Sequence, residues 1–556
     1  MTTAFEVADR FVDQVCELSP PLKTMLGIPG SDHEWGPMFG IDGAEARVDL
    51  YRSYRSTATG FLDAPDPRDR LAAAVMSAAI DEVVDTHEQG DHFLDLSHMA
   101  SSFRMLRSIF DVMKTDSTED WDAIANRLET IGEPLADYRA LLQAGVDQGI
   151  VVAARQVRSV VEQGRRLAGE GSSFEQVASK AESSGHASPR LDGAIGKAKS
   201  EMGSFADWLE VSYLPHARVD DGVGRDYYER AADRLVGMPV DALEAYRWGW
   251  EEFRRLLAEM ISVGGEILPG EGLLAVKDHM ETDRRYTVEG TDRLIRFVSD
   301  RLTLAVEALA GTHFDVPDAI RSITVQIAPA GGPLGVYYMR PSEDFSRPGG
   351  VWYSIGDQEV FPLYQHLSTA YHEGFPGHHL QLATAMYRKE NISRFQRALT
   401  WYPGYTEGWG MYAEVLMGEL GYLQEPGYYF GMLAKQMYRA ARIVVDIGLH
   451  LGLAIDETSP IAPGEPWTFE RACEFIEVYG FRTEDQARDE VLRYLGWPGQ
   501  AIAYKLGERE ILRLREETKS RLGDRFDLRQ FHSTVVDNGT MRLDLLRKFV
   551  GEALPG

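Results

Sequence analysis

The chain has 556 residues, 44% of them hydrophobic and 26% charged, which is an ordinary composition for a soluble globular protein with a large core. Its formal net charge is −28, from 58 basic and 86 acidic side chains, and this argues against nucleic-acid binding because phosphate neutralisation needs basic surface. The sequence has no uninterrupted apolar run that could span a membrane and begins without the apolar core of a signal peptide, so we expect a cytoplasmic protein.

The first 310 residues are predicted to be helical, because apolar side chains recur in them at helical spacing. The predicted helices cover residues 5–18, 44–57, 67–86, 136–167 and 240–261. The third begins clearly, since Asp66 can cap it and Pro67 suits its first position. Residues 169–188 are rich in Ser, Gly and charge and predict a loop. We expect an N-terminal helical region over 1–310 and a metal-binding catalytic region over 311–556, the two forming one intertwined unit.

Short strands are predicted after residue 320, where the pattern changes. Residues 322–327 alternate polar and apolar side chains and contain β-branched residues, as a strand does. Residues 336–339 and 350–354 are two further candidates, separated by a connection that contains Pro, Ser and Gly. A small sheet is therefore expected directly before the segment that carries the chemistry.

Three of the fourteen histidines fall within residues 372–379, next to a glutamate. Imidazole is a common zinc ligand, and a neighbouring carboxylate such as Glu373 can act as general base on water. The zinc-hydrolase pattern H-E-x-x-H places two histidines on one helical face, but here Pro376 stands where the second histidine belongs. The bland alternative is a solvated His-Glu pair on a helix surface, and three histidines around a Pro-Gly pair in an apolar context make it the weaker reading.

Helix geometry limits which histidine can join His372. His379 would return to the same face but about 10 Å further along the axis, while His378 would point about 120° away. Either histidine needs the helix to break, and Pro376-Gly377 is a helix breaker. We interpret the segment as H-E-x-x-H with two inserted residues, which makes His378 the preferred second ligand and His379 the reserve.

The motifs of this region resemble those of a bacterial family. Residues 372–381 read H-E-G-F-P-G-H-H-L-Q, an H-E-x-x-P-G-H-H motif similar to that of the domain-of-unknown-function family numbered 885, regarded as zinc-dependent peptidases. Residues 406–414 read T-E-G-W-G-M-Y-A-E and resemble the family's E-G-W-A-L-Y-A-E, from which Gly410 and Met411 depart. The likeness recurs in P-G-Q-A-I-A-Y-K-L-G and F-D-L-R-Q-F-H, at residues 498–507 and 526–532.

This resemblance, and the similar order of strands and metal-binding helix in zinc peptidases of the thimet oligopeptidase and carboxypeptidase Taq type, implies a fold. We expect a mainly α, two-lobed zincin-like fold around a cleft, with a small antiparallel β-sheet beside the active-site helix. In such enzymes an edge strand pairs with the substrate backbone. Gly350–Ser354 is the candidate edge strand, and Tyr353 is its expected side-chain contact. The alternative is a strand that only covers the core.

A third ligand is expected from another helix, and Glu407 and Glu414 are the candidates because a spacing of seven puts them on one helical face. Glu407 lies among aromatic residues, where a buried acid needs a partner. The resemblance to zinc peptidases implies that Glu407 is the ligand and that Glu414 lies behind the ligands.

Further candidates follow in the sequence. A helix over 428–452 brings Arg439, Arg442, Asp446 and His450 close to one face. These residues either form ordinary salt bridges along the helix or support the metal site and bind a substrate carboxylate. Tyr504 is the candidate donor to a developing oxyanion, with a packed core tyrosine as the alternative.

The predicted function is that of a zinc metallopeptidase that acts on short peptides. Zn²⁺ held by His372, His378 and Glu407 would polarise the carbonyl and lower the pKa of its water, and Glu373 would pass the proton to the leaving amine. Cleavage from the carboxyl end is expected if Arg439 or Arg442 binds a terminal carboxylate. The alternatives are a zinc hydrolase of a non-peptide amide and an inert metal-binding protein. The oligomeric state stays open.

Overall fold

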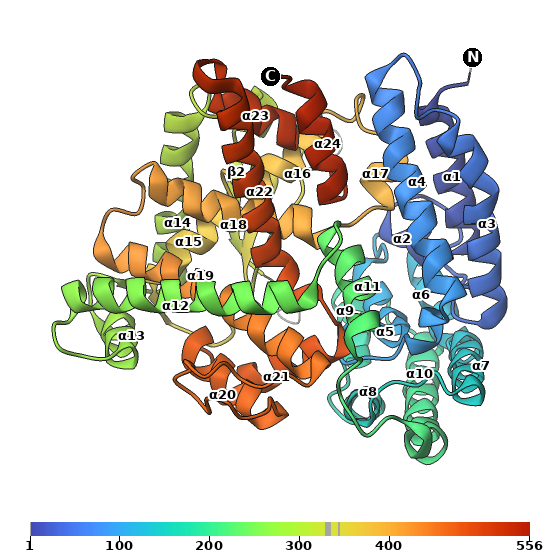
Figure 1. Ribbon diagram of the computed structural model, residues 1–556. Helices are drawn as coiled ribbons and strands as arrows, with labels where there is room; N and C mark the ends of the chain where they lie inside the picture. Colours follow the sequence, from blue (N-terminus) through green and yellow to red (C-terminus); the bar gives the residue numbers. More distant parts are fainter. Residues whose placement is uncertain (1, 329–334, 343–344) are drawn as a thin grey trace. The chain divides into compact units, whose positions relative to one another are not determined.

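The structure is a computed structural model that describes residues 2–328, 335–342 and 345–556 (Figure 1). It is mainly helical, as predicted, with a few short strands. The chain forms two compact units: an N-terminal unit of Met1–Gly222 with Leu495–Trp497, and a C-terminal unit of Val223–Tyr494 with Pro498–Gly556. This division falls earlier than the boundary at 310 expected from the sequence, because the helices between 225 and 309 pack within the C-terminal unit.

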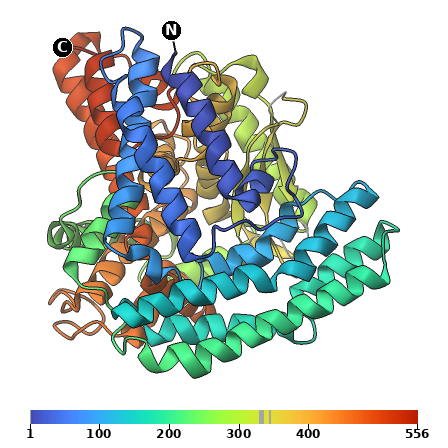
Figure 2. The same ribbon diagram turned by 90° about the vertical axis from the view of Figure 1, so that its right-hand side faces the viewer.

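Ten helices of the described residues make up the N-terminal unit. They are α1 (Ala4–Leu18), α2 (Pro20–Met25), α3 (Ile41–Thr59), α4 (Pro67–Glu88), α5 (Ser102–Val112), α6 (Thr118–Thr130), α7 (Gly132–Gln148), α8 (Ala154–Ala168), α9 (Ser173–Ser183) and α10 (Pro189–Trp208). Figure 2 shows α1, α3 and α4, in blue, side by side, and these helices contact one another. Helix α10 packs against α6 and α8 to form a second group.

Most helix predictions in this unit are confirmed, and the two errors have local causes. Asp66 caps α4 and Pro67 occupies its first turn, as expected. The helix predicted over 136–167 is two helices, because Gly149 adopts a left-handed conformation (φ 72°) that ends α7. The loop predicted over 169–188 contains α9, whose start is capped by Ser172 and whose apolar positions Phe174, Val177 and Ala181 are buried.

The C-terminal unit holds the remaining elements. Its helices are α11 (Arg225–Val236), α12 (Ala242–Ile267), α13 (Leu273–Thr282), α14 (Thr291–Leu309), α15 (Leu363–Glu373), α16 (His378–Tyr387), α17 (Arg394–Ala398), α18 (Pro403–Glu419), α19 (Pro426–Leu451), α20 (Phe469–Gly480), α21 (Glu484–Gly496), α22 (Gln500–Leu522), α23 (Leu528–Val536) and α24 (Leu543–Ala553). Helix α19 lies at the centre and packs against α12, α15, α20 and α22. No helix among the described residues is long and apolar enough to cross a membrane.

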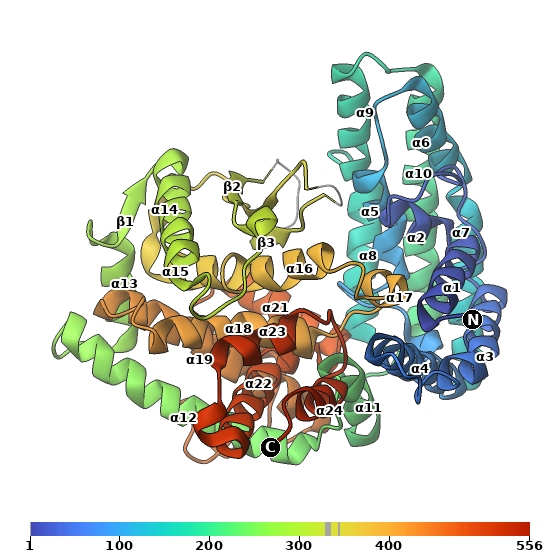
Figure 3. The ribbon, with the colours of Figure 1, turned by 90° about the horizontal axis from the view of Figure 1, so that it is seen from above.

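A three-stranded sheet precedes α15, as the sequence predicts. It consists of β2 (Ile323–Ile327), β3 (Val336–Met339) and β4 (Gly349–Tyr353), and a separate pair joins β1 (Thr287–Glu289) to β5 (Val360–Pro362). Figure 3 shows β2 and β3 beside α14, α15 and α16, in agreement with their contacts. Residues 343–344 of the predicted connection between β3 and β4 lie outside the described residues.

Two predictions about this sheet are wrong. The sheet is mixed rather than antiparallel, because β4 pairs with β2 in parallel and with β3 in antiparallel orientation. The predicted edge strand, Gly350–Ser354, is the central strand β4, in the order β2-β4-β3. Both sides of β4 are already bonded to neighbouring strands, so its backbone has no free row of groups for a peptide.

Glycine residues set the distance between α18 and α22. A Cβ atom at Gly408 would lie 2.6 Å from the backbone carbon of Gly507, and one at Gly507 would lie 2.0 Å from the carbonyl oxygen of Gly404. These distances are too short for any side chain, so the two helix backbones touch. The contact holds α18, which carries Glu407 and Glu414, directly against α22, which carries Tyr504.

Candidate metal centre

The segment between His372 and His378 breaks the helix, as predicted. Helix α15 ends at Glu373 and α16 begins at His378. Gly377 fits only because it has no side chain: a Cβ atom there would lie 1.9 Å from the carbonyl oxygen of His372. The amide of Gly377 instead donates to the carbonyl of Tyr371 at 3.0 Å, which folds the break back onto the end of α15. This turn brings the two histidine side chains to the same place.

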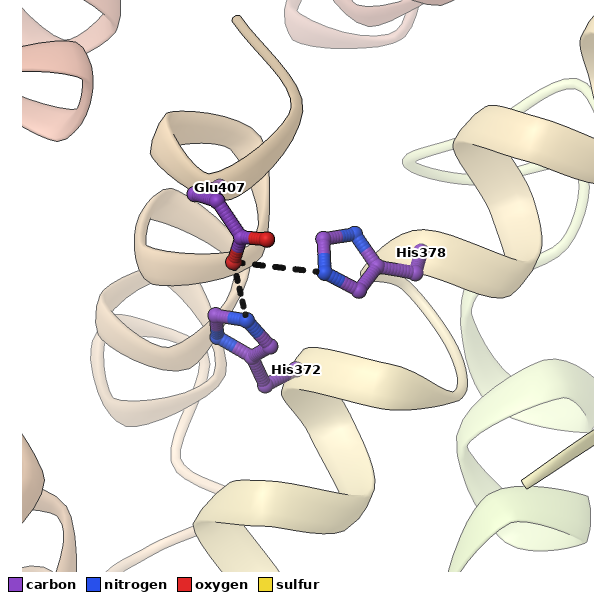
Figure 4. A group of neighbouring side chains, drawn as sticks. All are labelled: His372, His378 and Glu407. Carbon is purple, nitrogen blue, oxygen red and sulfur yellow. Dashed lines mark hydrogen bonds and ion pairs between the residues drawn. The ribbon is translucent and has the colours of Figure 1, made fainter. Parts of the chain in front are cut away.

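His372, His378 and Glu407 form one cluster (Figure 4). Oε2 of Glu407 lies 3.3 Å from Nε2 of His372 and 3.6 Å from Nε2 of His378, and one potential ligand atom from each residue lies within 4.8 Å of the other two. Donor atoms that each lie about 2.1 Å from a tetrahedral zinc ion are about 3.4 Å apart. The donor set and its spacing therefore fit a zinc ion.

A second layer of contacts orients His372. Its Nδ1 lies 2.8 Å from Oε1 of Glu414, and Ser368 donates to the other oxygen of that carboxylate. The carboxylate fixes which ring nitrogen points towards Glu407, as carboxylates do behind histidine ligands of metals. Gly410 lies against the ring, since a Cβ atom there would come within 2.6 Å of Cε1 and 2.7 Å of Nε2 of His372.

The electrostatics of the cluster favour a cation. Burial opposes protonation of His372, but its bonds to Glu407 and Glu414 raise its pKa to about 10. Burial alone would raise the pKa of Glu407. The interactions with His372 and His378 outweigh this effect and hold the pKa well below its usual value. A proton or a metal ion at this point is stabilised by the same carboxylates, and the two compete for the imidazole nitrogens.

The structure separates the two candidate second histidines. His379 is turned away: its Nε2 lies 2.7 Å from the carbonyl oxygen of Ile320, and its Nδ1 lies 3.1 Å from the hydroxyl of Tyr338. His378 faces Glu407, while its Nδ1 is buried and has no hydrogen-bond partner among the described residues. The cluster thus contains His378, with one ring nitrogen held less firmly than those of His372.

Glu373 follows His372 in the chain, is partly buried, and forms no hydrogen bond or ion pair with His372 or His378 in the described part of the chain. Burial raises its pKa, while His378 and His372 act in the opposite direction. The central strand brings Tyr353 close enough for its pKa to be raised by burial and by Glu373, and its hydroxyl has no hydrogen-bond partner among the described residues. Tyr353 therefore lies beside the site, although not on an edge strand.

Tyr504 lies on the other side of Glu407. Burial raises its pKa, followed by the charge of Glu407. Its ring stacks under two guanidinium groups, with Cζ of Arg442 at 4.9 Å and Cζ of Arg439 at 5.9 Å from the ring centre. Arg439 also interacts electrostatically with Glu373 and Glu414. The sequence-based candidates Tyr504 and Arg439 are thus adjacent to the cluster.

Arg442, Asp446 and His450 belong to a different network. Arg442 is paired with Glu490 at 3.2 Å, and Asp446 accepts from the hydroxyl of Tyr228 at 2.8 Å and from the amide of Gly499 at 3.1 Å. Nε2 of His450 lies 3.0 Å from the carbonyl oxygen of Tyr494. Within the described residues, neither Asp446 nor His450 forms a hydrogen bond or ion pair with the metal cluster. Among the described residues, the predicted group Arg439, Arg442, Asp446 and His450 forms one salt bridge along the helix, between His450 and Asp446 at 3.4 Å.

Sequence reasoning missed several residues that shape the site. In the sequence, nothing marks Ser368 and Gly410 as site residues except their positions. Ser368 lies one helical turn before His372, and Gly410 lies one turn after Glu407. Lys435 is also near the carboxylates of the site and near Arg482, as the charge effects on its pKa show. The spacing of Lys435 and Arg439 on one helix is a signal that could have grouped them.

Comparisons with known proteins identify the family. The profile of the family described as "Bacterial protein of unknown function (DUF885)" matches residues 20–550. A crystal structure described as "the putative lipoprotein from Colwellia psychrerythraea" has a TM-score of 0.83 at 22% identity and covers 100% of both chains. A structure of "a putative lipoprotein of unknown function from Shewanella oneidensis" has a TM-score of 0.77 at 16% identity, over 99% of this chain and 100% of the other.

At these identities the two structures establish the shared fold and nothing about activity. No curated protein matches the chain. The family match extends over nearly the whole sequence and includes both metal-cluster segments, residues 372–378 and 407. The chain belongs to the bacterial family of unknown function DUF885.

Proposed function

We propose that the protein is a zinc-dependent hydrolase that cuts peptide bonds in short peptides. The observation that carries this proposal is the position of Glu407 Oε2, 3.3 Å and 3.6 Å from the two histidine nitrogens, with Glu373 directly after the first histidine. Two imidazoles and a carboxylate leave one position of a tetrahedral zinc ion open, which is the arrangement of catalytic zinc sites. The two-lobed zincin-like arrangement around a cleft is part of the same proposal.

Zinc is the metal that this donor set favours. Imidazole ligands suit zinc better than magnesium or calcium, which prefer all-oxygen sites. A bound zinc ion would supply a Lewis acid and lower the pKa of a coordinated water. Glu414 and Ser368 would keep His372 in the tautomer that presents Nε2.

Glu373 is the proposed general base. Its pKa is raised by burial, so it takes up a proton more readily than an exposed glutamate. In the proposed reaction its carboxylate accepts the proton of the attacking water and delivers it to the leaving nitrogen. Tyr504, near Glu407, and Tyr353, near Glu373, are the hydroxyls that could donate to the negative charge that develops on the carbonyl oxygen.

The metal part of the proposal is tested by zinc content. Purified protein, stripped with a chelator and reloaded with zinc, is analysed by elemental mass spectrometry. We expect one zinc per chain in the wild type and loss of zinc in His372→Ala, His378→Ala and Glu407→Ala. His379→Ala is the matched control, because it removes the adjacent histidine whose nitrogens face Ile320 and Tyr338, and it should retain zinc. A His379→Ala variant that loses zinc while His378→Ala keeps it would contradict the assignment.

The catalytic part is tested by digestion of a peptide library, read by mass spectrometry. Glu373→Gln keeps the size of the side chain and removes its basicity, so zinc should stay bound while turnover falls by roughly a factor of 10² or more. Full turnover in this variant would show that another group is the base. A zinc-loaded wild type that cuts no peptide would reject the peptidase proposal and leave the non-peptide amide and the inert binding protein.

A further inference from the structure

Three basic side chains near the candidate metal centre form no ion pair with any residue that the structure describes. Lys435 and Arg439 lie one turn apart on α19, and Arg482 follows α20. Among the described residues, the Arg439 side chain donates one hydrogen bond, to the carbonyl oxygen of Lys435 at 3.4 Å, and its Nε is buried without a partner. Cζ of Arg482 lies 4.2 Å from the ring centre of Tyr438. We call Lys435, Arg439 and Arg482 the basic cluster; none of them forms an ion pair in the described part of the chain.

The basic cluster and the candidate metal centre are close enough to influence each other. Lys435 and Arg439 both interact electrostatically with Glu373 and Glu414. Arg439 also lies over the ring of Tyr504, whose pKa responds to Glu407. The cluster therefore lies within the same part of the C-terminal unit as the proposed base and the carboxylates of the metal centre.

Burial of the charges of the basic cluster is unfavourable, and no acidic side chain among the described residues forms an ion pair that would compensate for it. Burial, followed by repulsion from Arg482 and Arg439, lowers the pKa of Lys435 to about 7. Elsewhere in this unit buried cations have partners: Lys505 lies 2.8 Å from Glu508 and 3.0 Å from Glu252, and Arg493 lies 2.7 Å from Glu490. Buried charges are normally paired, so a group of like charges left unpaired next to a reactive centre indicates a site for an anion from outside the chain.

We propose that the basic cluster binds a carboxylate of the substrate and so makes the enzyme specific for peptides with a negative charge near the bond that is cut. This inference rests on the proposed function. A guanidinium such as that of Arg439 can bind a carboxylate through two parallel hydrogen bonds, and the ammonium of Lys435 adds a third donor. The carboxylate can come from the peptide's C-terminus or from an Asp or Glu side chain. Arg442 is not assigned to this site, because it is paired with Glu490 at 3.2 Å.

The test uses zinc-loaded protein and three sets of peptides with the same core sequences: free C-terminal acid, C-terminal amide, and amide with one Glu added. We expect the free acids to be cut at least about tenfold faster than the plain amides, because the amides cannot accept a charge-assisted hydrogen bond from the cluster. Faster cleavage of the Glu-containing amides would assign the carboxylate to a side chain instead. Equal rates on all three sets would overturn the proposal while leaving the peptidase function intact.

Variants connect the preference to the cluster. Arg439→Met should reduce the ratio of acid to amide rates to about one while zinc content stays at one per chain, and Arg439→Lys should keep part of the preference. Arg513→Met, which removes an exposed arginine that pairs with Glu517 on α22, is the matched control and should keep the full ratio. A full ratio in Arg439→Met would reject the assignment of the site to this residue.

A binding measurement separates failure of this inference from failure of the proposed function. N-acetyl-Ala-Ala with a free carboxylate should raise the midpoint of thermal unfolding of the wild type, and its C-terminal amide should not. Both should be without effect on Arg439→Met. If the acid shifts the wild type but no peptide is cut, the anion site stands and the peptidase proposal falls. If the acid and the amide act alike, and the Glu-containing amide acts like both, the anion site falls whatever the activity.

Discussion

We call the part of α19 up to Arg439 its first half and the part from Arg442 onwards its second half; the charged side chains of the two parts have different partners. In the second half, Arg442 is paired with Glu490, Asp446 accepts from Tyr228 and Gly499, and His450 bonds to the carbonyl of Tyr494. In the first half, Lys435 and Arg439 form no ion pair among the described residues, although both are partly buried. One helix thus combines charged side chains that are paired with neighbouring groups and charged side chains that form no ion pair among the described residues.

The difference follows from what each half packs against. The second half of the helix faces residues that supply partners, including Glu490 and Tyr494 of α21 and Tyr228 of α11. The first half interacts with Glu373 and Glu414, whose carboxylates belong to the candidate metal centre and of which Glu414 is already bonded to His372. Satisfied charges hold helices together, whereas unsatisfied ones beside a reactive group are available to a ligand.

The largest expected effect is a loss of stability on substitution in the second half of α19. Asp446→Ala should lower the free energy of unfolding by about 3 kcal/mol, because it leaves the buried hydroxyl of Tyr228 and the amide of Gly499 without their acceptor. The measurement is urea unfolding followed by tryptophan fluorescence. Asp446→Asn, whose amide oxygen can still accept one bond, should lose less. Zinc content should be unchanged in both, and loss of zinc would show that this network supports the metal centre after all.

A smaller effect is expected where a carboxylate orients a metal ligand. Glu414→Gln keeps the size of the side chain but weakens its bond to Nδ1 of His372, so zinc affinity should fall by about 10- to 100-fold. Competition with a fluorescent zinc chelator measures this. Glu419→Gln is the control on the same helix, because Glu419 is exposed and pairs with Arg515. Equal zinc affinity in Glu414→Gln and wild type would remove Glu414 from the support of the metal centre.

The part of the site that could be predicted from the sequence is the part that depends on the local conformation of the chain. The H-E-x-x-P-G-H-H motif and the rule that Pro-Gly breaks a helix were enough to predict that His378, rather than His379, faces His372. The spacing of seven between Glu407 and Glu414 correctly predicted a shared face of α18. Both inferences depend on residues close together in the chain.

What could not be predicted depends on contacts between distant segments. The sequence of residues 350–354 does not show whether this strand lies at the edge or in the centre of the sheet. Its central position results from pairing with β2 on one side and β3 on the other. Gly410 departs from the family pattern without polar consequence in the sequence, yet it lies against the ring of His372. The sequence places Arg439, Arg442, Asp446 and His450 near one helical face and leaves open whether they form salt bridges along the helix or support the metal site. The partners that divide them are far away in sequence.

The smallest expected effect is an increase in the free energy of unfolding, and it concerns the first half of α19. Lys435→Met keeps the aliphatic stem and removes a charge that burial and the neighbouring Arg482 and Arg439 disfavour, so the variant should be more stable than wild type by roughly 1 kcal/mol near neutral pH. The effect should depend on pH, because the pKa of this lysine is about 7 in the folded protein against an ordinary value of 10.5.

The direction of that dependence follows from proton binding. Below about pH 7 the lysine is charged in both states and the folded protein bears the full cost, so the gain from Lys435→Met is largest there. Between about pH 7 and 10.5 the unfolded chain binds more protons than the folded one, so the stability of the wild type rises with pH and the gain shrinks. Urea unfolding at about pH 6 and about pH 9.5 measures the change. A Lys435→Met variant less stable than wild type at pH 6 would mean that this lysine holds the fold together, and the contrast between the two halves of α19 would then disappear.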